Sequence, residues 1–339
     1  MRKFFISLLI IILLGGGAAG YFGYQMFYGK AVTEDFSVRI TPLTDYSAVV
    51  DKVKKYSKYD WAFEFYAEYL ELEKNLRVGT YLLYESMSVM TVVRTLKYGE
   101  STTLRLTINN ARTPEALAKK IAAKSDISEQ DMLEALRNKD LIEELGFDSA
   151  EAMFSIFIPN TYEFYSEITP HDLVRKFKSE SDKFWSQPER QRKLERLGMT
   201  PLEVMTLASI VHEETNATSE MARIAGVYIN RLNKDMLLQA DPTVKYALGD
   251  PTIKRILKRH LKVESPYNTY LNKGLPPTPI AMPDVVAIEA VLNYEAHDYL
   301  YFCARPEFDG KHNFARTDKE HAANARAYHE ALNKRNIKK

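Results

Sequence analysis

One stretch decides how the C-terminal part of this chain folds: Thr200-Pro201-Leu202-Glu203-Val204-Met205-Thr206-Leu207-Ala208-Ser209-Ile210-Val211-His212-Glu213-Glu214-Thr215. Its beginning is typical of a helix start, because Thr200 and Glu203 have the spacing of a capping box and proline is favoured at the first helical position. Apolar residues then recur at helical spacing, at Val204, Leu207, Ile210 and Val211. The stretch therefore predicts a helix with an apolar face that packs against a core.

Two neighbouring glutamates follow that apolar face. Glu214 lies three and four residues beyond Val211 and Ile210 and ends the face, whereas Glu213 lies about 100° round the helix, on the line of its polar residues. A carboxyl group at the rim of an apolar wall has a raised pKa, which a general acid at neutral pH requires. Glu214 is therefore the candidate catalytic acid. Two glutamates at a solvated helix end would explain the same pattern.

Polar and aromatic residues are dense in the region that follows Glu214. Sugars offer apolar ring faces and hydroxyl edges, so this mixture is typical of a carbohydrate cleft. Because proline favours an extended residue before it, Asp241 and the preceding amide are predicted to lie on a loop. Turn chemistry and core tyrosines remain the alternative. The candidate substrate-binding residues are Gln239, Asp241, Thr243, Tyr267, Asn268, Thr269 and Tyr270.

Several function classes find no support in the sequence. The His212-Glu213-Glu214-Thr215-Asn216 segment lacks the second histidine of a zinc protease motif, so no metal is expected. No nucleophile elbow, Walker loop or dinucleotide fingerprint occurs, so no cofactor is expected either. A formal charge of +1 gives no signal for nucleic acid, and the single Cys303 excludes an intramolecular disulfide.

The N-terminus predicts a membrane anchor. Arg2 and Lys3 precede an uncharged stretch over residues 4–29, long enough to span a bilayer. The positive-inside rule leaves both cations in the cytoplasm and exports the chain after about Lys30. The prediction is a single-pass protein of the cell inner membrane with its remaining domains in the periplasm. A cleaved signal peptide is the alternative, because small residues at positions 17–20 follow the apolar core.

The pattern of helices and strands predicts an α+β fold in four parts. Residues 1–30 are the cytoplasmic tip and transmembrane anchor. Residues 31–112 form a small α+β module, with strands at 36–40 and 103–108 and helices at 46–56 and from Ser88 to about Lys97. A spacer role alone would also explain this module. Residues 113–197 are a mostly helical connecting region, and residues 198–339 form a mixed α/β domain that carries Glu214.

At these residues the chain resembles the endolytic murein transglycosylase (MltG or YceG-like) family. The resemblance lies in ordered motifs: Ala208-Ser209-Ile210-Val211-x-x-Glu214-Thr215, Ile224-Ala225-Gly226-Val227-Tyr228-Ile229-Asn230-Arg231-Leu232, Leu238-Gln239-Ala240-Asp241-Pro242-Thr243, Tyr267-Asn268-Thr269-Tyr270, Gly274-Leu275-Pro276-Pro277-x-Pro279-Ile280-Ala281, Tyr299-Leu300-Tyr301-Phe302 and His312-x-Phe314. The resemblance implies that residues 79–81 belong to a LysM-like module and that residues 198–339 are the catalytic domain. Two positions depart from the family pattern, His212 for a first glutamate and Asn160 for an aspartate.

The resemblance also implies a reaction. The family cleaves the MurNAc-GlcNAc β-1,4 bond of peptidoglycan glycan strands without water, leaving 1,6-anhydro-MurNAc ends, and so terminates nascent strands. Glu214 would be the single acid and base, and cell-wall synthases would be partners. Two alternatives stay open: a hydrolytic muramidase that uses Glu214 and Asp241, and a non-catalytic peptidoglycan-binding scaffold of the wall-synthesis machinery.

Overall fold

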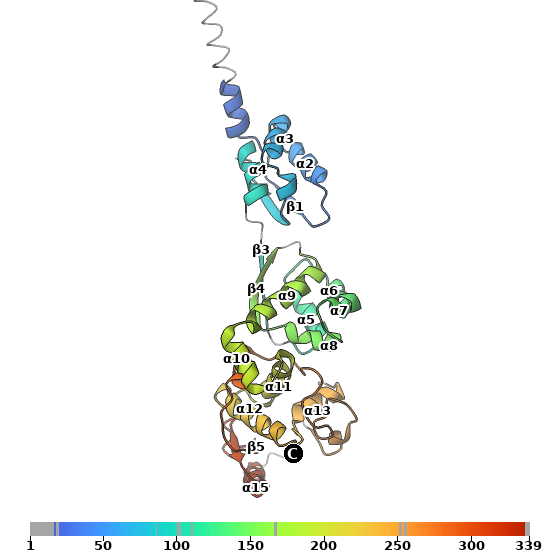
Figure 1. Ribbon diagram of the computed structural model, residues 1–339, viewed down its shortest axis with the longest axis vertical. Coiled ribbons are helices and arrows are strands. Elements are labelled where there is room, and N and C mark those ends of the chain that lie inside the picture. Colours follow the sequence, from blue (N-terminus) through green and yellow to red (C-terminus); the bar gives the residue numbers. More distant parts are fainter. Residues whose placement is uncertain are drawn as a thin grey trace, which may run out of the picture. The chain divides into compact units, whose positions relative to one another are not determined.

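The computed structural model describes residues 17, 20–85, 87–99, 103–109, 111–165, 168–250, 253 and 256–335. The chain separates into two compact units, the first made of Met1–Arg105 with Glu163–Thr169 and the second of Leu106–Tyr162 with Pro170–Lys339 (Figure 1). Helices and small two-stranded sheets occur in the chain, which confirms the α+β class. The expected boundary near residue 198 falls inside the second unit.

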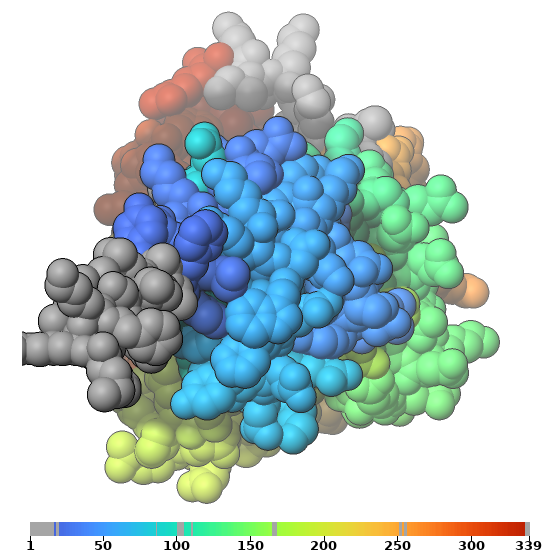
Figure 2. All heavy atoms as spheres, turned by 90° about the horizontal axis from the view of Figure 1, so that it is seen from above, coloured from blue at the N-terminus to red at the C-terminus, as the bar shows by residue number. Residues whose placement is uncertain are grey.

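The first unit is a small α+β module. Strands β1 (Phe36–Ile40) and β2 (Gly79–Leu83) pair antiparallel, with Phe36 opposite Leu83. Helices α2 (Tyr46–Lys55), α3 (Asp60–Tyr69) and α4 (Val89–Tyr98) and the short η1 (Glu73–Asn75) complete it. As predicted, α4 begins after Ser88, whose side chain accepts a hydrogen bond from the Thr91 amide. Helices α2 and α3 belong to the blue surface in Figure 2.

Most of the expected membrane anchor, residues 1–16, 18 and 19, lies outside the described residues. Of the remainder, residues 20–28 are helical. Among the residues that the structure describes, no helix combines the length and the apolar character needed to cross a bilayer.

The second unit is mostly helical. Its N-terminal part contains α5 (Pro114–Ala122), α6 (Glu129–Arg137), α7 (Lys139–Glu144), α8 (Ala150–Met153), η2 (Phe154–Ile156), α9 (Pro170–Trp185) and α10 (Pro188–Leu197). Strands β3 (Thr103–Ile108) and β4 (Asn160–Tyr165) form a two-stranded sheet, and the boundary between the two units falls within both strands. Its C-terminal part contains α11 (Pro201–Glu214), α12 (Thr218–Asn233), α13 (Asp241–Leu248), η3 (His260–Lys262), α14 (Val285–Leu292), the antiparallel pair β5 (Tyr301–Ala304) and β6 (His312–Ala315), and α15 (Asp318–Lys334).

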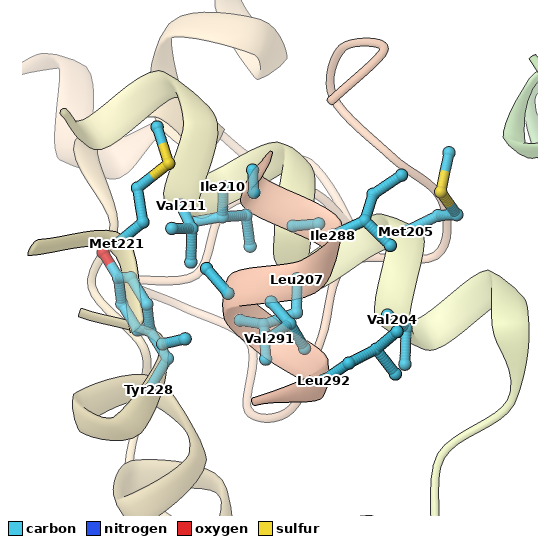
Figure 3. Close-up of a cluster of buried hydrophobic side chains, with 14 of the residues drawn as sticks. Val204, Met205, Leu207, Ile210, Val211, Met221, Tyr228, Ile288, Val291 and Leu292 are labelled. Carbon is cyan, nitrogen blue, oxygen red and sulfur yellow. The ribbon is translucent and has the colours of Figure 1, made fainter. Parts of the chain in front are cut away.

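Helix α11 is the centre of the C-terminal core. Thr200 caps it with the predicted capping box, in which Glu203 bonds back to the Thr200 amide at 2.7 Å. Its side chains pack against α12 and α14, as Figure 3 shows for Leu207, Ile288 and Val291. The expected single apolar face was too narrow, because every residue from 204 to 211 is buried. A helix enclosed on all sides carries apolar residues all round.

The two polar residues of this buried stretch satisfy their hydroxyl groups inside the protein. Thr206 donates to the Leu202 carbonyl at 2.8 Å, and Ser209 donates to the Thr206 carbonyl at 2.7 Å. Ser209 also accepts the Ile280 amide at 3.0 Å. The hydroxyl groups are therefore hydrogen-bonded rather than solvated, which is why a polar residue does not mark an exposed face here.

The expectation that Asp241 lies on a loop was wrong. Asp241 is the first residue of α13, and Pro242 follows it in the first turn. Proline is tolerated there because the first amides of a helix have no partner within it, and a carboxylate is favoured near the positive end of the helix. Gln239 does lie outside a helix, in a left-handed conformation with φ of 52°.

Candidate active site

Glu214 ends α11 at a cavity of about 420 Å³. The cavity is lined by Glu214, Tyr228, Arg231, Leu238, Gln239, Asp241, Tyr270, Tyr301, Phe302, Cys303, Ala304, His312, Asp318 and His321. A larger cavity of about 750 Å³ lies in the first unit, lined by α2, α3 and the segment that follows α3. Volume alone therefore does not identify the site. The smaller cavity is distinguished by a carboxyl group whose pKa is shifted toward neutrality.

Burial sets the protonation of Glu214. Removal of the carboxyl group from water raises its pKa to about 7, while a hydrogen bond from Tyr228 opposes the rise and the charges of Asp241 and Glu213 add to it. The Tyr228 hydroxyl donates to Glu214 Oε1 at 2.6 Å. Tyr228 itself is held protonated, because burial and the neighbouring carboxylate raise its pKa well above its usual value. A group with such a pKa can both give and take a proton near neutral pH.

A second carboxylate faces the same cavity. Asp241 Oδ1 accepts a hydrogen bond from the Tyr270 hydroxyl at 2.7 Å. Burial and this contact with Asp241 raise the pKa of Tyr270, so the tyrosine stays a donor. Three of the predicted substrate-binding residues, Gln239, Asp241 and Tyr270, thus line the cavity together with Glu214.

Arg231 organises the wall that carries Gln239. Its guanidinium donates to the carbonyls of Leu237 and Leu238, both at 3.0 Å, and to the Gln239 side-chain oxygen at 3.3 Å. It also donates to the Leu300 carbonyl at 2.6 Å, ahead of β5. The same side chain therefore ties α12 to two segments that border the cavity.

Glu213 faces another cavity. Its carboxylate pairs with Arg112, Nη2 to Oε2, at 2.7 Å. Both residues line a neighbouring cavity of about 650 Å³, together with Tyr267. The two adjacent glutamates thus contribute to different cavities, and the predicted contact residue Tyr267 lies on the Glu213 side.

Three further predicted contact residues are buried below the surface. Thr243, Asn268 and Thr269 are each at most 1% exposed. The Asn268 amide donates to the carbonyls of Leu261 and Val263, at 3.0 and 2.8 Å, and the Thr243 and Thr269 hydroxyls lie 2.8 Å apart. These bonds hold the segment that presents Tyr270. Their direct contact with substrate stays a prediction.

Ten cavity residues were not among the predicted site residues, and they include Tyr228, Arg231, Tyr301, His312, Asp318 and His321. The first four stand in the family motifs, which is the only signal the sequence carries for them. Asp318 and His321 belong to α15, and the amphipathic pattern of that helix does not predict that it borders a cavity formed by residues distant in sequence. The buried Glu220 holds His312 in place, with its carboxylate 3.1 Å from His312 Nδ1.

His212 lies away from this group. Its Nδ1 is 3.6 Å from Asp284 Oδ2, beside the start of α14. It does not line the cavity, so the departure from the family pattern removes no carboxylate from the wall around Glu214. Within the described ranges, no group of three or more His, Cys, Asp or Glu side chains is arranged to hold a metal ion.

Comparisons with known proteins agree on one family. The YceG-like family matches residues 38–327. An endolytic murein transglycosylase of Bacillus subtilis is 28% identical over 87% of this chain and 87% of its own length. One of Streptococcus pneumoniae is 29% identical over 91% of this chain, which spans only 62% of that longer protein. A solved structure of a yceG-like protein from Listeria monocytogenes is 27% identical, with a TM-score of 0.56 over 86% of this chain and 99% of its own. This chain belongs to the YceG-like family.

Proposed function

We propose that this protein is an endolytic lytic transglycosylase that cleaves the MurNAc-GlcNAc β-1,4 bond of peptidoglycan glycan strands. The observation that carries the proposal is the Glu214 carboxyl group, partly buried at the wall of a 420 Å³ cavity, with a pKa raised to about 7. The curated relatives named above carry the name of this activity. In this role the enzyme terminates the elongation of nascent strands, with cell-wall synthases as its partners.

One carboxyl group suffices for the proposed reaction. Protonated Glu214 gives its proton to the oxygen of the leaving GlcNAc while the bond to C1 of MurNAc breaks. The resulting carboxylate then accepts the proton of the C6 hydroxyl as that hydroxyl attacks C1. The product is a 1,6-anhydro-MurNAc end, and no water is consumed. Glu214 regains its proton and the cycle closes.

The Tyr228 hydroxyl supports both halves of this cycle. It donates to Glu214 Oε1 at 2.6 Å, which leaves the other carboxyl oxygen free of that bond for proton transfer. The bond also stabilises the carboxylate formed when the leaving group is protonated. Gln239, Asp241 and Tyr270 offer an amide, a carboxylate and a phenol to the hydroxyl edges of the sugar.

Mass analysis of the products from intact sacculi tests the proposal. Anhydro ends are the expected result. Reducing ends would instead indicate a hydrolytic muramidase, a candidate favoured by the presence of Asp241 in the same cavity. Uncut strands bound to the protein would indicate a non-catalytic scaffold.

We also propose that residues 1–30 anchor the protein in the cell inner membrane, with a LysM-like module and the catalytic domain in the periplasm. The charge pattern of Arg2 and Lys3 before the uncharged stretch supports this topology. A reporter that is active only in the periplasm, fused after Lys339, should be active. An inactive reporter on a stably inserted protein would contradict the wall-enzyme proposal.

A further inference from the structure

Helix α3 carries three exposed aromatic side chains on one side. Trp61, Phe65 and Tyr69 recur every four residues and are 62%, 53% and 72% exposed. We call these three residues the aromatic face. The Trp61 and Phe65 rings stack on each other at 5.8 Å. Large side chains grouped in this way are unusual on a surface that meets only water.

The aromatic face is continuous with the helix at residues 20–28. The Phe27 ring lies 6.3 Å from the Trp61 ring and 6.2 Å from the Phe65 ring, both edge to face. The same helix exposes further aromatic side chains, Tyr21, Phe22, Tyr24 and Tyr28. Phe27 and the aromatic face therefore form one set of contacting aromatic rings.

The position of Phe27 in the chain places this set near a lipid boundary. A span of about 20 apolar residues, counted from Phe4, ends near Gly23. Phe27 lies four residues farther, or about 6 Å along a helix. The headgroup layer outside the hydrocarbon core is about 5 to 7 Å thick on each side. With the anchoring proposed above, Phe27 and the rings it contacts would fall within that layer.

We propose that the aromatic face of α3 lies in the headgroup layer of the bilayer, beside the point where the chain leaves the membrane. This inference rests on the membrane anchoring proposed above. Tryptophan and tyrosine are enriched at membrane interfaces because their rings are apolar and their polar atoms can bond to water and headgroups. The contact holds the first unit against the lipid surface.

The charges beside the aromatic face define the kind of lipid contact. Asp60, Glu64 and Glu68 also recur every four residues, and they lie about 100° round α3 from the aromatic face. They would repel anionic lipid, and Lys54 already pairs with Glu64 at 2.6 Å. The contact is therefore made by the rings, and it forms with zwitterionic lipid and resists salt.

Fluorescence of the full-length protein in phosphatidylcholine vesicles tests this inference, because the chain has two tryptophans, Trp61 and the buried Trp185. In a Trp185→Phe variant, lipids brominated near the top of their acyl chains should quench at least about half of the Trp61 emission. If that variant does not fold, the difference between the wild type and Trp61→Phe isolates the same signal. The pair Phe65→Ser and Tyr69→Ser should lower the quenching.

A matched control uses Leu43, a 95% exposed residue in the loop that joins β1 to α2. Figure 1 shows this loop at the end of the first unit remote from the helix at residues 20–28. A tryptophan introduced as Leu43→Trp, with Trp61→Phe and Trp185→Phe, should keep the emission of a water-exposed ring and escape quenching. Quenching equal to that of Trp61 would overturn the inference.

The remaining outcomes separate the inference from the anchoring proposal. If the protein floats with the vesicles but its Trp61 emission stays that of a water-exposed ring, the anchoring proposal holds and the proposed contact is wrong. Protein that does not float overturns the anchoring proposal and the contact with it. A Trp61 signal that responds to glycan fragments and not to lipid would assign the aromatic face to sugar. A signal that depends on protein concentration would assign it to a second copy of the chain.

Discussion

Replacement of Glu214 by glutamine should abolish cleavage. Glutamine keeps the size of the side chain and can still accept the Tyr228 hydroxyl bond of 2.6 Å, but it cannot exchange a proton. Loss of a general acid and base typically lowers the rate by about 10² to 10⁴-fold, and here one group performs both steps. The assay is the release of anhydro-MurNAc ends from purified glycan strands by residues 31–339.

The same substitution should raise stability at alkaline pH. The native carboxyl group has a pKa of about 7 instead of 4.5, a difference that corresponds to about 3 kcal/mol. The native state binds this proton more tightly than the unfolded state, so the stability of the wild type falls as the pH rises from about 4.5 to about 7. Glutamine does not titrate. Its advantage over the wild type should therefore grow across this window, to at most about 3 kcal/mol above pH 7.

The control is Glu213→Gln, which breaks the ion pair with Arg112 at the neighbouring cavity. It should keep most of the activity and cost at most about 1 kcal/mol, since Arg112 is largely exposed. Denaturant unfolding of all three proteins at pH 5 and pH 8 gives the stability comparison. Comparable activity of Glu214→Gln and the wild type would refute the catalytic assignment. Loss of activity only in Glu213→Gln would transfer the role to the other face of α11.

Four further substitutions test the surroundings of Glu214. Tyr228→Phe removes the bond that lowers the Glu214 pKa, so the pH at which kcat/KM falls on the alkaline side should move upward from about 7, as a pH profile will reveal. Asn268→Ala leaves the partly buried carbonyls of Leu261 and Val263 without their donor and should cost about 1 to 3 kcal/mol in denaturant unfolding. Asp241→Asn should instead lower kcat/KM with the unfolding midpoint nearly unchanged. Gly226→Ala would press a methyl group against the backbone oxygen of Glu295 and should cost about 1 to 3 kcal/mol; an unchanged melting temperature would show that α12 can move away.

Helix α11 was predictable because its signals are local. The capping box of Thr200 and Glu203 fixes its start, and apolar residues at helical spacing predict that it packs against a core. The full burial of the helix was not predictable in the same way. It depends on α12 and α14, which pack on it from positions later in the chain. Ser209 shows the difference, because only the distant Ile280 amide explains a buried hydroxyl there.

The cavity wall was predictable only in part for the same reason. Gln239, Asp241 and Tyr270 were found by composition and resemblance, but nothing in that composition separates them from the buried Asn268. The folded segment separates them, because the Asn268 side chain donates to backbone carbonyls whereas the Tyr270 side chain lines the cavity. Asp318 lines the cavity from α15, at a separation in sequence that no local pattern can bridge.

The pKa of Glu214 results from opposing influences supplied by different elements. Burial at the end of α11 and the negative charge of Asp241 at the start of α13 raise it, while the Tyr228 hydroxyl on α12 lowers it. With burial alone, Glu214 would stay protonated and could not accept the C6 proton. With hydrogen bonds to both oxygens it would stay a carboxylate and could not protonate the leaving oxygen. A value of about 7 allows both steps of the proposed cycle. The packing of α11 against α12 is therefore part of the chemistry, because it sets the distance between Tyr228 and the carboxyl group.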